Sequence, residues 1–192
     1  LDKFFELAPW ILMFLVPAIT MRSFSDEFKA GTFEILKTKP LTPFQIVAGK
    51  YASVLVVLLF VIVPTFIYII TIKVLSASGS IDAGGIAGSY LGLFLLAAVF
   101  ASISICCSSF TSNAVVAFLV SAFVCLVLYF GFNAISKLPV VQGSADFYIE
   151  MLGIDFHYRS ISRGVLDTRD LVYFASLILL SLLITVKNLH KK

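Results

Sequence analysis

The sequence predicts an all-α protein, a polytopic membrane helical bundle, from three observations. Of its 192 residues, 60% are hydrophobic and only 13% are charged, too few to cover the surface of a soluble domain. The apolar residues gather into five long segments, which charged or Gly- and Pro-containing stretches separate. About 20 apolar helical residues cross a hydrocarbon core of about 30 Å. The bilayer must therefore be most of this protein's solvent.

Five membrane spans are expected within a single domain that covers residues 1–192. They lie at about 7–21, 46–72, 89–107, 114–135 and 171–186. The middle three can cross a bilayer unaided, whereas the first and last need flanking cations such as Arg22 and Lys187 to reach the interface. Pro17 and Pro64 fall inside spans and should kink them.

The distribution of lysine and arginine orients the chain in the membrane. Residues 22–50, the turn at 108–113 and the tail from 187 onward would share one side, and they hold eight of the 14 Lys and Arg residues. Basic residues in short loops favour the cytoplasmic side. We therefore expect a multi-pass protein with a cytoplasmic C-terminus that faces membrane lipids with its basic tail.

The charged stretch at residues 25–50, between the first two spans, is predicted to lie outside the bilayer. Five charges fall within twelve residues of it, and each would cost about 2.5–3.5 kcal/mol at the bilayer centre. A helical period over about 24–37 gives one apolar face, made of Phe24, Phe28, Gly31 and Ile35. Phe33 then projects among the charges on the opposite face, either as a knob for a partner's groove or as a surface Phe without a role.

Lys39 and Pro40 are expected to end this surface helix, and the next span then starts at a cap. Thr42 is the predicted N-cap, Pro43 occupies the first helical position and Gln45 completes a capping box. The surface helix is thus joined at a defined angle to a membrane-spanning helix. Such a lever suits the transmission of movement from an external partner into the membrane.

The connection at about 140–170 is predicted to form amphipathic helices at the extracellular face. Its length and mixed polarity suit helices that lie at the outer leaflet or dip into it. The residues expected to shape it are Phe147, Met151 and Ile154 for an apolar face, Gly153 and Gly164 for a looser backbone, and Asp167 or Thr168 for the cap of the last span.

The same connection holds the one cluster that resembles an acid/base or metal site, His157 with Asp155 and Glu150. An i, i+4 ion pair between Asp155 and Arg159 is the simpler interpretation, and a lone His in an interfacial helix is usually structural. The three cysteines lack zinc-type spacing. We predict no metal site, and an intramembrane enzyme is the minor alternative.

Motifs for other chemistry are missing from the sequence. A phosphate-binding P-loop needs Gly-x4-Gly-Lys-Ser/Thr, but Gly49-Lys50 is followed by Tyr51. No run of five like charges indicates nucleic acid. The span interiors lack the Asp, Glu or His that an ion-coupled secondary carrier would use. We expect no enzymatic activity and no cofactor on this chain. An ion-coupled secondary carrier and a non-transporting membrane scaffold are kept as alternative functions.

Two stretches resemble the membrane-spanning permease subunits of type-2 ABC exporters. The first carries Glu27, "GTFE" at 31–34, Leu36, Pro40 and "GK" at 49–50. The second, "FHYRSISRGVLDTRDLVYF" at 156–174, is similar to the extracellular re-entrant helices and the start of the last span in such permeases. Together they look closest to the permease associated with gliding motility in gliding bacteria.

The resemblance implies a six-span ABC transporter permease of a bacterial inner membrane, two to a transporter, as a homodimer or a heterodimer. A separate cytoplasmic ATPase would bind ATP and Mg, and the helix at about 24–37 would dock on it as the coupling helix. The implied ATPase-coupling residues are Glu27, Gly31, Thr32, Phe33, Glu34, Leu36 and Pro40. The implied residues of the re-entrant helices are His157, Arg163, Gly164 and Asp167.

The sequence departs from this family pattern at its N-terminus. It shows five predicted spans where the family has six, and it opens at Leu1 without a basic n-region. We therefore expect the first span of the family, with the cytoplasmic helix before it, to lie upstream of this sequence.

Overall fold

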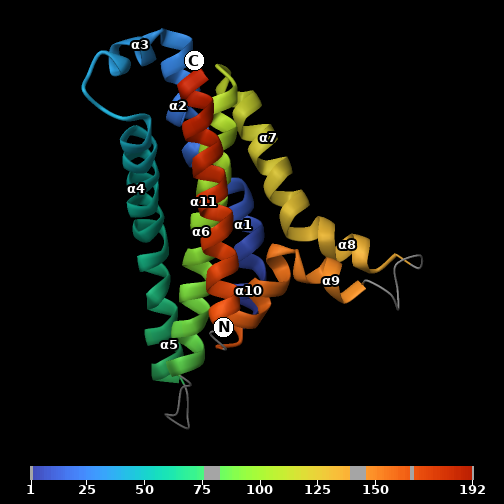
Figure 1. The fold of residues 1–192 in the computed structure, drawn as a ribbon. Coiled ribbons are helices and arrows are strands. Elements are labelled where there is room, and N and C mark those ends of the chain that lie inside the picture. The colour runs from blue at the N-terminus through green and yellow to red at the C-terminus, as the bar shows by residue number, and fades with distance from the viewer. Residues whose placement is uncertain (1, 76–82, 139–145, 165–166, 192) are drawn as a thin grey trace.

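The computed structural model describes residues 2–75, 83–138, 146–164 and 167–191, and every regular element within these ranges is helical (Figure 1). The elements are α1 (Asp2–Thr20), α2 (Arg22–Ala30), α3 (Thr32–Lys37), α4 (Pro43–Ile62), η1 (Val63–Phe66), α5 (Ile67–Leu75), α6 (Ala83–Phe110), α7 (Ala114–Leu126), η2 (Val127–Gly131), α8 (Phe132–Ser136), α9 (Asp146–Met151), α10 (Ile154–Ser162) and α11 (Thr168–Lys191). This confirms the predicted all-α class.

Five helical stretches in the described residues are long and apolar enough to cross a membrane, as the helical bundle prediction required. They are Lys3–Ala30, Pro43–Thr71, Gly84–Phe110, Ala114–Ser136 and Thr168–His190. The helices run beyond the apolar segments at both ends of the chain. Polar residues therefore continue the first and last spans, because a helix end in the headgroup region needs no apolar side chains.

Helix α6 is the centre of the bundle, with α1, α4, α7, α10 and α11 packed around it (Figure 1). Within its most apolar window 72% of the residues are buried by protein, against 17% in the α4 span. Ala97, Ala101 and Ser104 are fully buried on α6. Small side chains let helix backbones approach closely. Close approach matters here because helices in lipid associate mainly through van der Waals packing and not through the hydrophobic effect.

Helices α4 and α7 lie on opposite sides of α6 (Figure 1), and both carry exposed apolar side chains. Phe60 on α4 is 74% exposed and Phe123 on α7 is 66% exposed. Exposed apolar faces of this extent fit contact with lipid tails. Pro64 breaks the regular α-helix, since η1 is a 3-10 turn at Val63–Phe66.

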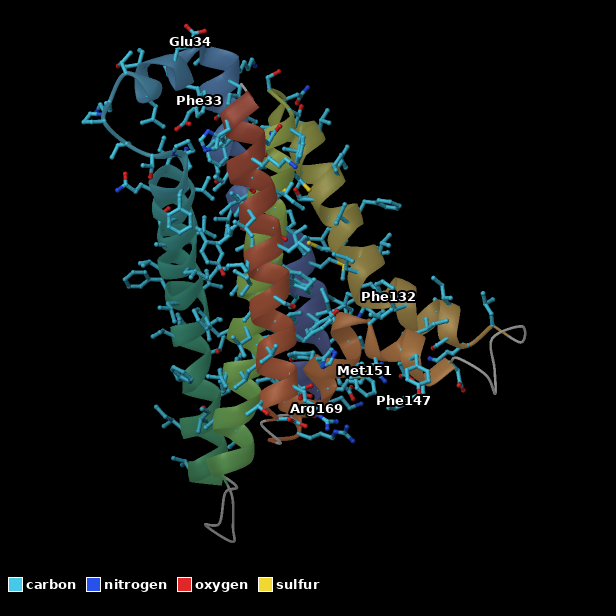
Figure 2. The ribbon with its side chains drawn as sticks, in the orientation of Figure 1. Phe33, Glu34, Phe132, Phe147, Met151 and Arg169 are labelled. Carbon is cyan, nitrogen blue, oxygen red and sulfur yellow. The ribbon has the colours of Figure 1, made fainter. Side chains whose placement is uncertain are left out.

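The two short helices α9 and α10 lie at the end of the bundle opposite α2 and α3 (Figure 1). The predicted apolar face of Phe147, Met151 and Ile154 is wrong. Helix α9 ends at Met151 and α10 starts at Ile154, so the three residues do not share one helix. Ile154 is fully buried, whereas Phe147 and Met151 are exposed (Figure 2).

Candidate functional site

The charged segment after the first span folds as two short helices, not as the single helix predicted for about 24–37. Gly31 lies between α2 and α3 with φ of 70°, and its backbone N–H donates to the carbonyl oxygen of Glu27. This left-handed conformation closes a helix C-terminus and favours glycine. At its other end α2 continues α1 after Met21 alone, so the break lies at Gly31.

The break at Gly31 reverses the predicted facing of the apolar residues that follow it. Phe33 is only 6% exposed, and its ring meets that of Phe28 edge to face with centroids 5.0 Å apart. Ile35 is 63% exposed instead. The predicted outward knob at Phe33 and the inward position of Ile35 are therefore both wrong, because a helical period cannot be carried through a left-handed residue. Figure 2 shows Phe33 below α3 and Glu34 on the outer side.

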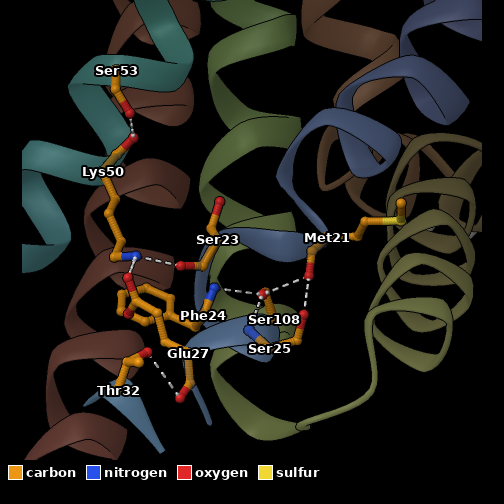
Figure 3. A network of polar contacts seen from close by, with 9 residues as sticks. All are labelled: Met21, Ser23, Phe24, Ser25, Glu27, Thr32, Lys50, Ser53 and Ser108. Atoms are coloured by element: carbon orange, nitrogen blue, oxygen red, sulfur yellow. Dashed lines mark hydrogen bonds and ion pairs between the residues drawn. The ribbon is translucent and has the colours of Figure 1, made fainter. Parts of the chain in front are cut away.

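Ser108, near the C-terminal end of α6, holds the start of α2. Its hydroxyl accepts hydrogen bonds from the backbone N–H groups of Phe24 at 3.1 Å and Ser25 at 3.2 Å. The same hydroxyl donates to the carbonyl oxygen of Met21 at 2.9 Å (Figure 3). Ser108 is fully buried. The first N–H groups of a helix have no partner within it, so this side chain caps α2 from another helix and fixes it to α6.

Lys50 on α4 joins α2 through an ion pair. Its Nζ lies 2.6 Å from Oε1 of Glu27 and also donates to the carbonyl oxygen of Ser23 (Figure 3). The ammonium lies 4.6 Å from the centroid of the Phe24 ring. The side chains of Lys50 and Glu27 are 22% and 31% exposed, so water screens the pair only in part. Helices α2, α4 and α6 thus meet at one polar node, which we define as Ser23, Glu27, Lys50 and Ser108.

The predicted capping box is present at the start of α4. The backbone N–H of Gln45 donates to Oγ1 of Thr42 at 3.3 Å, and the N–H of Thr42 donates to Oε1 of Gln45 at 2.9 Å. Pro43 takes the first helical position. The capping box therefore fixes the α4 end of the linker at residues 38–42, which connects α3 to the membrane span.

The other residues that the family resemblance singles out lie on the surface of this end of the molecule. Gly31, Thr32, Glu34 and Pro40 are exposed, and Leu36 is half-buried. Helix α3 stands beyond the ends of α6 and α11 (Figure 1). Among the α3 side chains that the structure describes, Thr32, Glu34 and Ile35 are exposed, and Ile35 is the apolar one of these three.

His157, at the opposite end, has a different partner from the ones predicted. Its Nδ1 lies 2.6 Å from Oδ1 of Asp170, and its Nε2 donates to the carbonyl oxygen of Met151 at 2.8 Å. The ring stacks on Tyr173 with centroids 3.9 Å apart. His157 thus fastens α9 and α10 to the first turn of α11. No group of three or more His, Cys, Asp or Glu side chains in the described residues is arranged to hold a metal ion.

Asp155 pairs with Arg159 as the spacing predicts. Nη2 of Arg159 lies 2.8 Å from Oδ2 of Asp155, and its Nε donates to Oδ1 at 2.9 Å. Asp155 is therefore not free to act with His157 as an acid or base. The sequence does not predict Asp170 as the partner of His157, because it places Asp170 only in the first turn of the last span, three residues after the cap at Asp167.

Gly164 packs tightly and does not loosen the backbone as predicted. It has φ of 83°, and a Cβ added there would lie 2.7 Å from Cα of Gly85 on α6. A Cβ on Gly88 would likewise lie 2.9 Å from Cα of Gly164. Asp167 caps α11, since its Oδ1 accepts from the N–H of Arg169 at 3.0 Å. Arg163 is exposed, and its Nε donates to the carbonyl oxygen of Arg159 at 3.0 Å.

These elements define a multi-pass helical membrane protein with a charged helical segment at one end and a helical cap at the other. The family model of the ABC-2 family transporter protein matches residues 4–149, more than half of the sequence, and the chain belongs to this family. Membrane subunits of this family are normally non-catalytic permeases, and membership implies an ATPase partner. No curated protein matches the chain.

Proposed function

We propose that the chain is the permease subunit of an ATP-driven ABC exporter, and that a separate ATPase docks on α3. Family membership supports this reading, because membership implies an ATPase partner that supplies the energy. The single observation that carries the proposal is the polar node. Through the contacts of the polar node, a displacement of α2 and α3 would move three membrane helices, α1, α4 and α6.

The route of transmission follows from the contacts. Helix α3 packs on α2 through the rings of Phe33 and Phe28. Helix α2 is bound to α4 by Lys50 and to α6 by Ser108. Closure of two ATPase subunits on ATP and Mg would displace α3 and carry the cytoplasmic ends of α1, α4 and α6 with it. The spans would then reopen on the other side.

The proposal also covers the orientation of the permease in the membrane, the membrane in which it lies and its second subunit. The distribution of Lys and Arg supports a cytoplasmic location for α2, α3 and the C-terminus. The family resemblance supports a bacterial inner membrane, a second permease that is identical or related, and a role in gliding motility. Exposed apolar surface on α4 and α7 leaves room for both lipid and a second subunit.

A double substitution on the outer surface of α3 tests the docking. In the intact complex, Glu34→Arg with Ile35→Asp should release the ATPase while membrane insertion and thermal stability stay unchanged, because both side chains are exposed. Co-purification of the ATPase in mild detergent measures this. The matched control is Ser112→Arg with Phe110→Asp, two exposed positions at the same end of the bundle but outside α3. Full ATPase retention in the α3 variant, or equal release in the control, would contradict the proposal.

A further inference from the structure

A cavity of about 1000 Å³ lies at the end of the bundle opposite α2 and α3. Its walls come from α1, α6, η2, α9 and α10. Cavities of about 300–1000 Å³ are the size that holds small organic ligands. The wall residues from α1 and α6, such as Glu6 and Ile86, belong to the first two turns of these membrane spans. The cavity therefore lies at the level of the lipid headgroups.

Direct contacts hold the walls of this cavity in place. The glycine contact described above presses the end of α10 against α6 at Gly164. The hydroxyl of Ser89 on α6 donates to the carbonyl oxygen of Ser162 on α10 at 2.7 Å. The Tyr158 hydroxyl donates to the carbonyl oxygen of Phe5 on α1 at 2.9 Å. Burial, and then the nearby Asp155 carboxylate, raise the pKa of Tyr158, so this donor keeps its proton. The cavity is preformed.

The charges that line the cavity are of both signs. Asp155 and Arg159 neutralise one another through two contacts of 2.8 and 2.9 Å. Arg163, Glu6 and Glu150 also line it, and no ion pair joins these three to any described residue. The lining thus holds two cations and three carboxylates. A purely anionic ligand would face net repulsion, whereas a ligand with one positive and one negative group can satisfy both.

We propose that this cavity binds the headgroup of an ethanolamine phospholipid. Arg163 and the outer edge of Arg159 would hold the phosphate, because guanidinium groups bind phosphate oxygens with two parallel hydrogen bonds. The carboxylates of Glu6 and Glu150 would hold the ammonium group. Phe5, Ile86 and Phe156 supply apolar wall for the glycerol and the first methylene groups. Free glycerophosphoethanolamine shares this chemistry, but the position of the cavity at the level of the lipid headgroups favours the membrane lipid.

The site does not depend on how the ATPase is coupled. Its lining residues on α9 and α10 lie at the opposite end of the molecule from α3 (Figure 1), so lipid binding and ATPase retention are separable readouts of one preparation.

The test is retention of phosphatidylethanolamine by the intact detergent-solubilised complex, measured by native mass spectrometry against phosphatidylglycerol. Arg163→Gln, Glu150→Gln and Glu6→Gln should each lower the affinity for phosphatidylethanolamine about tenfold, as loss of one charge-assisted hydrogen bond implies. Phosphatidylglycerol should bind weakly to all forms. The matched controls are Arg169→Gln and Asp146→Asn, which remove one charge at the same end without lining the cavity. They should bind as the wild type does.

Three results would overturn the proposal. One is equal retention of phosphatidylglycerol by the wild-type complex. The second is unchanged phosphatidylethanolamine affinity in all three cavity variants, with Glu6→Gln as the variant least able to disturb folding because Glu6 is exposed. The third is displacement of the lipid by an equal concentration of glycerophosphoethanolamine, which would assign the site to a soluble ligand.

Discussion

At the scale of single residues, the ion pair between Glu27 and Lys50 is the contact on which the proposed transmission depends. The two residues lie 23 positions apart in sequence, on different helices, and meet at 2.6 Å in a partly buried position. Oε2 of Glu27 is buried and has no hydrogen-bond partner among the described residues. The carboxylate therefore depends on Lys50 for much of its stabilisation.

Lys50→Met should damage both stability and coupling. Removing the ammonium leaves a partly buried carboxylate unpaired, which should cost about 1–3 kcal/mol of the free energy of unfolding. The ATPase should still bind, because the surface of α3 is unchanged, but transport-linked ATP hydrolysis should fall. The exchange Glu27→Lys with Lys50→Glu should recover part of both losses. Thermal unfolding and ATPase assays of the complex measure the two effects.

The pair between Arg22 and Asp26 is the matched control for this prediction. It is also an ion pair of α2, but its atoms are 4.0 Å apart and its side chains are 71% and 52% exposed. Arg22→Gln should change the free energy of unfolding by less than about 0.5 kcal/mol. A loss equal to that of Lys50→Met, with coupling impaired as well, would show that general charge at this end matters rather than the node.

Local spacing explains which residue contacts were predictable. The capping box at Thr42 and the pair of Asp155 with Arg159 both join residues three or four apart, where helix geometry sets the distance. The contacts of Glu27 with Lys50 and of His157 with Asp170 join separate helices. Their formation depends on how those helices pack, which the order of residues in one helix does not state.

At the scale of elements, Gly31 separates two helices that a single helical period would join. Its left-handed backbone turns α3 so that Phe33 is buried and Glu34 and Ile35 face outward. The sequence contained the signal, a glycine between two helical stretches. The apolar period runs through this glycine without interruption, so periodicity alone predicts one continuous helix and does not reveal the C-cap.

Gly31→Ala should be destabilising for conformational reasons alone. No described atom lies within 4 Å of a Cβ added at Gly31, so the cost is that of the left-handed conformation, about 1 kcal/mol. Gly49→Ala is the matched control, since it is equally free of neighbours but lies within α4. That change should be neutral or stabilise by up to about 1 kcal/mol. Thermal unfolding of both variants measures the change in stability. Equal shifts in the unfolding temperature would contradict a special role for Gly31.

At the scale of the whole molecule, apolar length predicted the spans but not their arrangement. Five segments of sufficient length give five helices, because an uncharged stretch in lipid must satisfy its own backbone. Nothing in hydropathy selects α6 as the central helix, since lipid tails and protein interiors are equally apolar. Its small residues, from Gly88 to Ser104, are the only sign of close packing, and many helix pairs could use such a surface.

Docking of a cytoplasmic ATPase on the outer surface of α3 is tested most directly by cross-linking in intact cells. A photo-activated cross-linking residue placed at Ile35 should join the permease to an ATP-binding subunit, and one placed at Val63, exposed on the membrane span, should not. A cross-link from Ile35 only to lipid or to extracellular protein would contradict the account.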